Sequence, residues 1–147
     1  MKTSKNYISI VLLTFFIAPL LFACASTPKQ PLWDTQGIQR VFIMPFDVIG
    51  QSEGERERAK TNHTLTQDLF QRSGRFIIVD TADQADAIFR GELIDSARLR
   101  YADQSYYTEI VSYSLTRTSD GSIVGENAVY GDGLSFLKCL EQELGIR

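Results

Sequence analysis

The chain has 147 residues, of which 44% are hydrophobic and 22% are charged. This composition fits one folded domain and excludes disorder throughout. The formal charge is −3, and an acidic chain lacks the basic surface that nucleic-acid binding requires. A single histidine excludes metal sites built from several histidines.

Residues 1–23 have the three-part pattern of a secretory signal peptide. Lys2 and Lys5 give a positive start, an apolar run covers residues 8–23, and small residues end it. The run is short and contains the helix breaker Pro19, which argues against a permanent transmembrane helix. We therefore expect an exported protein.

The segment Leu21–Cys24 resembles the lipobox of bacterial lipoproteins. That resemblance implies cleavage between Ala23 and Cys24, a lipid on the Cys24 sulfur and an acylated amino terminus. An ordinary signal peptide followed by a coincidental cysteine is the alternative. Loss of residues 1–23 would change the formal charge from −3 to −5, because two lysines are removed. The second cysteine, Cys139, would have no disulfide partner, and we expect a buried thiol.

Residues 24–37 form the predicted tether, and residues 38–147 form the predicted single periplasmic domain. Small polar residues and prolines follow Cys24, which is typical of a linker. Ala25, rather than aspartate, follows the lipidated position, and this resembles the outer-membrane sorting rule of diderm bacteria. We expect an anchor in the outer membrane facing the periplasm, with Trp33 packed on the domain rather than at the membrane interface.

The first half of the domain reads as strand, helix and strand. Residues 41–44 are an apolar run ended by proline, which indicates a buried strand. Residues 55–73 have a helical pattern that ends before Gly74, and residues 76–79 follow as a second buried strand. This order predicts a parallel pair. His63 is predicted on the polar helix face, exposed to solvent.

The second half reads as three half-exposed strands and a closing helix. The strands cover residues 87–101, a run around residues 111–115, and residues 123–130, with turns at residues 102–105 and 119–121. Alternation along the first of them places Leu93, Ala97, Leu99 and Tyr101 on one face. The complete order is β-α-β-β-β-β-α, an α+β two-layer sandwich with a mixed sheet and both helices on one face.

The chemistry-bearing residues do not form a known catalytic or metal motif. Asp80, Asp83 and Asp86 recur every third residue, whereas a calcium-binding loop of the EF-hand type needs ligands at alternate positions and a distal glutamate. We expect them to cap a turn. The sequence predicts no catalytic residues, no metal site and no cofactor.

Tyrosines crowd around one predicted hairpin. Tyr106 and Tyr107 are consecutive in a strand and so occupy opposite faces, and Tyr101 lies across the turn. Exposed aromatic side chains are typical anchors of protein contacts, so these three residues are candidate partner-binding residues. Packing beneath the helices is the alternative.

Five segments resemble the α/β domain shared by curli-secretion, penicillin-binding-protein-activator and lipopolysaccharide-assembly lipoproteins. They are "RVFIMPF", "LTQDLFQRSGRFIIVD", "ADAIFRGEL", a tyrosine-rich strand, and "SDGSIVGENAVYGDG". The resemblance implies a non-enzymatic, membrane-anchored accessory or assembly factor that binds an envelope protein or glycolipid. A lipopolysaccharide-assembly-type lipoprotein is one alternative. A small ligand-binding protein or enzyme, with a cavity lined by Glu92, Asp95 or Glu109, is another, and a merely structural surface lipoprotein is a third.

Overall fold

The computed structural model describes residues 33–50, 52–101, 104–132 and 134–146, and the side chains of all of these except residues 96–107. Two α-helices, six strands and one 3₁₀ helix lie in this part of the chain. The strands are β1 (Arg40–Ile43), β2 (Asp47–Val48), β3 (Ile77–Ile78), β4 (Ala87–Tyr101), β5 (Gln104–Arg117) and β6 (Ile123–Gly131); the helices are α2 (Glu53–Arg72), η1 (Ala82–Gln84) and α3 (Ser135–Leu144).

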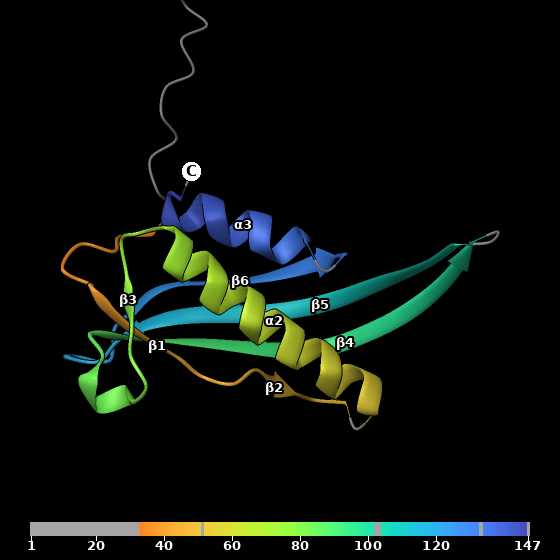
Figure 1. Cartoon of the computed structure of the whole chain (residues 1–147), viewed down its shortest axis with the longest axis horizontal. Helices are drawn as coiled ribbons and strands as arrows, with labels where there is room; N and C mark the ends of the chain where they lie inside the picture. Colours follow the sequence, from red (N-terminus) through yellow and green to blue (C-terminus); the bar gives the residue numbers. More distant parts are fainter. Residues whose placement is uncertain (1–32, 51, 102–103, 133, 147) are drawn as a thin grey trace, which may run out of the picture.

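The strands form one mixed sheet in the order β3-β1-β4-β5-β6, with β2 paired to β4 beside β1. The pairs β1–β3, β1–β4 and β2–β4 are parallel, and the pairs β4–β5 and β5–β6 are antiparallel. Helices α2 and α3 pack on the same face of this sheet (Figure 1). The predicted α+β sandwich is therefore confirmed, with one strand, β2, that was not predicted.

Side chains that alternate along the central strands make the core beneath the helices. Val41, Phe89 and Val111 are fully buried, and Phe70 of α2 packs its ring edge-to-face on Phe89 at 5.5 Å between centroids. Full burial of each such apolar side chain stabilises the fold by about 1.5–3 kcal/mol. Leu140 closes the core from α3.

Sequence signals at both ends of α2 explain its length. Ser52 and Glu55 form a capping box, in which the Ser52 hydroxyl accepts from the Glu55 amide and the Glu55 carboxylate accepts from the Ser52 amide. The C-terminal end is followed by Gly74 with φ of 64°, a left-handed conformation that glycine adopts readily. The helix begins two residues before the predicted residue 55.

A bulge in β4 changes which residues share a face. The register pairs Leu93 with Val111, but beyond the irregularity between Leu93 and Asp95 it pairs Ala97 with Thr108. Directly opposed residues share a face and successive residues alternate, so Leu93 and Ala97 hold positions on opposite faces. The prediction that they share a face is wrong, because one extra residue reverses the alternation.

The first described residues pack on the domain. The Trp33 indole is 6% exposed and lies over β6, and its backbone amide donates to the Glu143 carbonyl of α3 at 3.1 Å. The Arg75 guanidinium donates to the Thr35 hydroxyl at 2.8 Å and to the Leu144 carbonyl. Residues 33–37, which are the last part of the predicted tether, thus contact the folded domain.

Helix α3 carries a free cysteine. Cys139 is half-buried, not fully buried as predicted. Within the residues that the structure describes, neither α-helix is long and apolar enough to cross a membrane.

Candidate partner-binding surface

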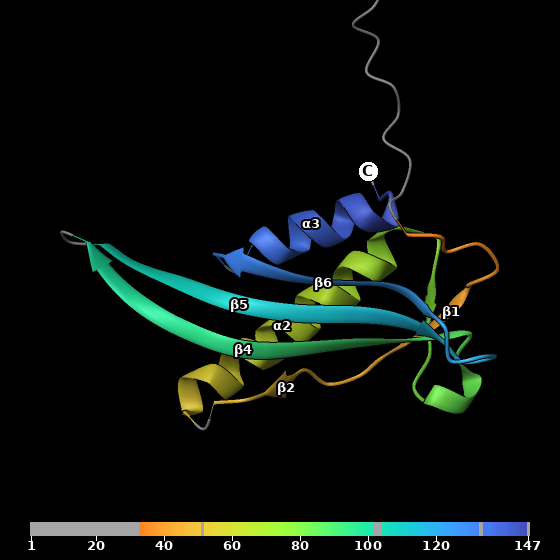
Figure 2. The ribbon, with the colours of Figure 1, turned by 180° about the vertical axis from the view of Figure 1, so that it is seen from behind.

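Within the part of the chain that the structure describes, no helix covers the face of the sheet opposite α2 and α3. Figure 2 shows this face in front, with α2 behind the strands. Along β5 the buried residues Val111, Tyr113 and Leu115 alternate with half-exposed Ser112 and Ser114, so the two serines lie on the uncovered face. We call this surface the open face.

The centre of the open face is a shallow hollow of about 540 Å³. Its charged side chains are Arg90, Glu92 and Glu126, joined by Asp47 of β2. The Ser112 hydroxyl donates to the Glu92 carboxylate at 3.3 Å. The hollow contains three carboxylates and one guanidinium, so its net charge is negative. Its charged groups therefore offer mainly hydrogen-bond acceptors.

Two large exposed side chains lie on β6, one on either side of its residues that line the hollow, Glu126 to Ala128. Tyr130 is 71% exposed and lies opposite Ile110 in the register, and Ile123 at the other end of the strand is 60% exposed. An exposed aromatic ring beside polar groups is typical of a contact anchor. Sequence reasoning did not select Tyr130, Arg90 or Glu126. The alternation of serines with buried residues in β5 was the signal available for the open face.

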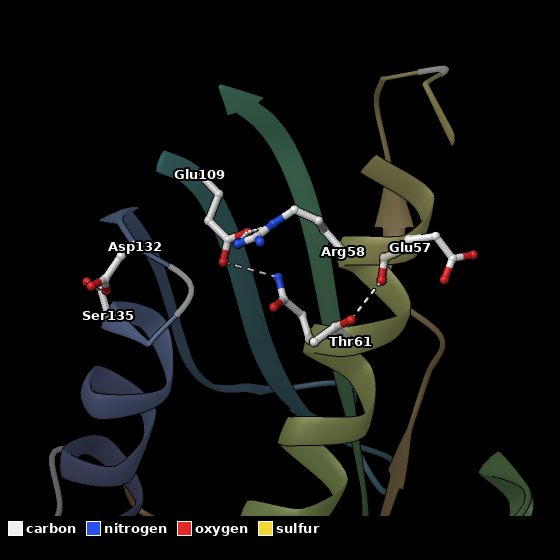
Figure 3. A network of polar contacts seen from close by, with 7 residues as sticks. Glu57, Arg58, Thr61, Glu109, Asp132 and Ser135 are labelled. Atoms are coloured by element: carbon white, nitrogen blue, oxygen red, sulfur yellow. Dashed lines mark hydrogen bonds and ion pairs between the residues drawn. The ribbon is translucent and has the colours of Figure 1, made fainter. Parts of the chain in front are cut away.

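A buried ion pair fastens α2 to β5 on the other face of the sheet. Glu109 is 2% exposed, and the Arg58 guanidinium donates to its carboxylate from Nε at 3.0 Å and from Nη2 at 2.9 Å (Figure 3). The Asn62 amide donates to the second oxygen at 3.4 Å. Both oxygens of this buried carboxylate are thus engaged by side chains of α2, so loss of a partner would leave a buried charge uncompensated.

The three carboxylates considered for a ligand cavity therefore do not converge. Glu92 lines the hollow, Asp95 is exposed outside it, and Glu109 lies beneath α2. The predicted alternative of a cavity that gathers these groups has no support in their positions.

A second buried carboxylate joins α3 to the sheet. Glu143 is 5% exposed and accepts from the Tyr113 hydroxyl at 2.8 Å and from the Asn127 amide at 2.7 Å. Burial and, to a smaller extent, the Glu143 carboxylate raise the pKa of Tyr113 far above its ordinary value. Tyr113 therefore remains a hydrogen-bond donor at every physiological pH.

His63 is half-buried, so the predicted exposed position is wrong. Its Nδ1 lies 3.0 Å from the Met44 carbonyl oxygen, to which it donates, and its ring meets Phe46 edge-to-face at 6.4 Å between centroids. The residue links α2 to the segment after β1. Its place is set by these contacts, which a helical periodicity does not reveal.

The prediction that the aspartates around η1 cap a turn is wrong, because η1 has no side-chain cap hydrogen bond and Asp86 instead contacts the start of β1. In the described ranges, no group of three or more histidine, cysteine, aspartate or glutamate residues is arranged to hold a metal ion. Asp86 accepts from the Gln39 and Arg40 amides and from the Arg40 guanidinium, at 3.1, 2.8 and 2.8 Å. The hydrogen bond from the Arg40 side chain is the largest cause that lowers the pKa of Asp86 to about 2. Asp80 and Asp83 are exposed.

The remaining predicted site residues fall outside the described side chains. Ala23 and Cys24 lie outside the described residues altogether. Tyr101, Tyr106 and Tyr107 lie in the described backbone of the β4–β5 hairpin, where Tyr106 is opposite Leu99 and Tyr107 is opposite Arg98. Their role in partner binding stays a prediction.

Comparisons with known proteins give structural neighbours without sequence relatives. No protein-family model matches the chain. No curated protein matches it either. It is similar to the PelC dodecamer subunit from Paraburkholderia phytofirmans, with 12% identity over 74% of this chain and 83% of that one, at a TM-score of 0.48. It is similar to lipoprotein GNA1162 from Neisseria meningitidis, with 7% identity over 63% and 81% and a TM-score of 0.48. The LpoB C-terminal domain from Salmonella enterica matches at 9% identity over 79% and 92%, with a TM-score of 0.38. All three identities lie below 25% and all three TM-scores lie below 0.5, so these neighbours give no information about the function of this chain.

Proposed function

We propose that the chain is a non-enzymatic lipoprotein of the bacterial envelope that is anchored through Cys24 and binds another envelope protein with the open face of its sheet. The observation that carries this proposal is the open face itself, a polar hollow beside exposed Tyr130 that no described helix covers. Charged groups, hydroxyls and an exposed aromatic ring are the composition of the polar rim and anchors of a non-obligate interface.

The proposed anchor and the open face lie on different sides of the domain. Eight residues lie between Cys24 and Trp33, and such a segment spans at most about 30 Å when fully extended. Trp33 meets the last turn of α3, whereas the long β4–β5 hairpin extends away from that end (Figure 1). The proposed anchor therefore keeps the domain near the membrane from the helix side and leaves the open face accessible to a partner.

The anchoring half of the proposal is tested by metabolic labelling with palmitate. The unaltered chain should incorporate label, and Cys24→Ser should remove it, because the proposed acceptor sulfur is gone. Cys139→Ser is the matched control and should retain the label. Labelling that persists in Cys24→Ser contradicts the lipid anchor.

The binding half is tested by photo-crosslinking in intact cells. A photoreactive amino acid at Ser114 should give a protein adduct of defined mass, since this residue lines the hollow. The same probe at Asp68, an exposed position on α2, is the matched control and should give none. Reversing the charges with Arg90→Glu and Glu126→Arg should abolish the Ser114 adduct.

Equal adducts from Ser114 and Asp68, or no adduct from Ser114, would contradict the assignment of the open face. An adduct with lipopolysaccharide instead of protein would replace the proposal with the lipopolysaccharide-assembly alternative. Either result leaves the labelling test of Cys24 unaffected.

A further inference from the structure

The β4–β5 hairpin extends beyond every other described strand. The pairing of β6 with β5 ends at Gly131 opposite Glu109, and the pairing of β2 with β4 ends at Val48 opposite Leu93. Residues 96–101 of β4 and 104–108 of β5 therefore pair with each other and with no other described strand. We call these two segments the arm, which projects past both helices in Figure 1.

An arm of this kind exposes two rows of unpaired backbone groups. A two-stranded ribbon without a third strand or a helix is marginally stable in water. Each of its edges is a template for pairing with another strand. An additional strand would satisfy one edge and stabilise the arm.

The two edges differ in charge. The β4 edge carries Arg98 and Arg100, and charged residues are a common protection of exposed edges. The β5 edge, residues 104–108, reads Gln-Ser-Tyr-Tyr-Thr and contains no charge, no proline and no glycine. Tyrosine and threonine favour strands, so the β5 edge is the one suited to pairing.

We propose that the β5 edge of the arm pairs antiparallel with the same edge of a second copy of this chain. A two-fold axis at Tyr106 places residue 104 opposite residue 108 and residue 105 opposite residue 107, and all of these residues are uncharged. Pairing through the β4 edge would bring arginines of the two copies together, which is unfavourable. The inference goes beyond the proposed function, since it uses the arm and leaves the open face free.

The choice of a second copy follows from this self-complementarity. An antiparallel two-fold pair extends the hydrogen-bond ladder equally on both copies and buries no charged group. Copies anchored in one membrane would also meet at a high local concentration. Tyr106 and Tyr107, predicted as contact residues, would then lie in the interface between copies.

Disulfide trapping in the full-length, membrane-extracted protein tests the pairing. With Cys139→Ser in the background, Tyr106→Cys should form a covalent dimer on mild oxidation, because opposed antiparallel residues have Cα atoms about 4.5–5.5 Å apart, within disulfide reach. Leu99→Cys is the matched control, because Leu99 lies opposite Tyr106 on the β4 edge of the same arm. It should remain monomeric.

Equal trapping at both positions, or none at Tyr106, would overturn the proposal. A second measurement uses light scattering on Tyr106→Lys and Leu99→Lys, which add the same charge to opposite edges. The first should convert the dimer to a monomer and the second should leave the dimer intact, while far-ultraviolet circular dichroism confirms that both are folded. Retention of the dimer in Tyr106→Lys would refute pairing through the β5 edge, whether or not the Ser114 crosslink is retained. Loss of the Ser114 crosslink alone would refute only the proposed function of the open face.

Discussion

Replacement of Gly125 by alanine should displace Trp33 from the surface of the sheet. A Cβ atom at this position would lie 2.2 Å from Cε2 and from Nε1 of the indole, far inside van der Waals contact. The indole also packs against Tyr113 at 5.8 Å between centroids, and the backbone of Trp33 is fixed because its amide donates to the Glu143 carbonyl. The ring cannot keep its place, because the added carbon is attached to a strand.

The expected cost lies between two limits. Complete expulsion of a tryptophan loses about 150–250 Å² of buried surface, or about 4–6 kcal/mol as an upper estimate. A shift that keeps part of the contact costs about 1–3 kcal/mol, as overpacking generally does. Alanine is more favourable than glycine in a strand, which offsets the loss of stability by about 0.5–1 kcal/mol. We expect Gly125→Ala to lower the free energy of unfolding by about 3 kcal/mol.

Urea unfolding and tryptophan fluorescence measure this effect, since Trp33 is the single tryptophan. The fluorescence emission of folded Gly125→Ala should shift to longer wavelength. In a Trp33→Ala background, Gly125→Ala should leave the free energy of unfolding almost unchanged. Gly54→Ala is the control, because its added carbon meets no other part of the domain within 4 Å, apart from its chain neighbours and the nearby backbone of its own helix, and α2 gains helix propensity. A loss below about 1 kcal/mol with unchanged emission, or an equal loss in the Trp33→Ala background, would refute the steric argument.

Three other predictions concern polar contacts. Arg58→Met should lower the free energy of unfolding, measured with urea, by about 3 kcal/mol, because Glu109 is left buried without its cation. Adding Glu109→Leu should restore most of the lost stability. A loss below about 1 kcal/mol in Arg58→Met would contradict this expectation. Asp86 has a folded-state pKa of about 2, below its ordinary value, so its contribution to stability is complete above about pH 4 and is lost as the pH falls toward 2. Thermal unfolding of Asp86→Asn should therefore depend less on pH in that window, and parallel curves for variant and parent would oppose the assignment. Tyr113→Phe removes one donor from buried Glu143 and should cost about 1.5–3 kcal/mol in thermal unfolding, whereas an unchanged midpoint would show that the bond contributes nothing.

The sequence predicted the elements that have a long periodic pattern or a strong end signal. Helix α2 and its end at Gly74, the parallel pair of β1 and β3, and the turn at Gly121 were all evident from residue types. Strand β2 was missed because two residues, Asp47 and Val48, carry no periodicity; their pairing with β4 is a tertiary contact. Local patterns predict local structure, and short strands depend on neighbours far along the chain.

The candidate surface was harder to predict because it depends on register. The bulge after Leu93 reverses the alternation of residues between the two faces of β4. The residue types around it do not indicate an extra residue. Glu92, Asp95 and Glu109 looked equivalent in the sequence, yet Glu92 lines the hollow and Glu109 pairs with Arg58. Only the paired strands distinguish a carboxylate that lines the hollow from one that contacts α2.

The hydrogen bond between the Trp33 amide and the Glu143 carbonyl brings the start of the folded part to the last turn of α3. If the chain is anchored through Cys24 as proposed, a fluorescent protein fused on the C-terminal side of α3 would lie beside the anchor, on the membrane side of the domain. Such a fusion would report on anchoring and leave the arm and the open face unobstructed. A reporter of partner binding must instead be inserted into the sheet, for example by labelling Ser114.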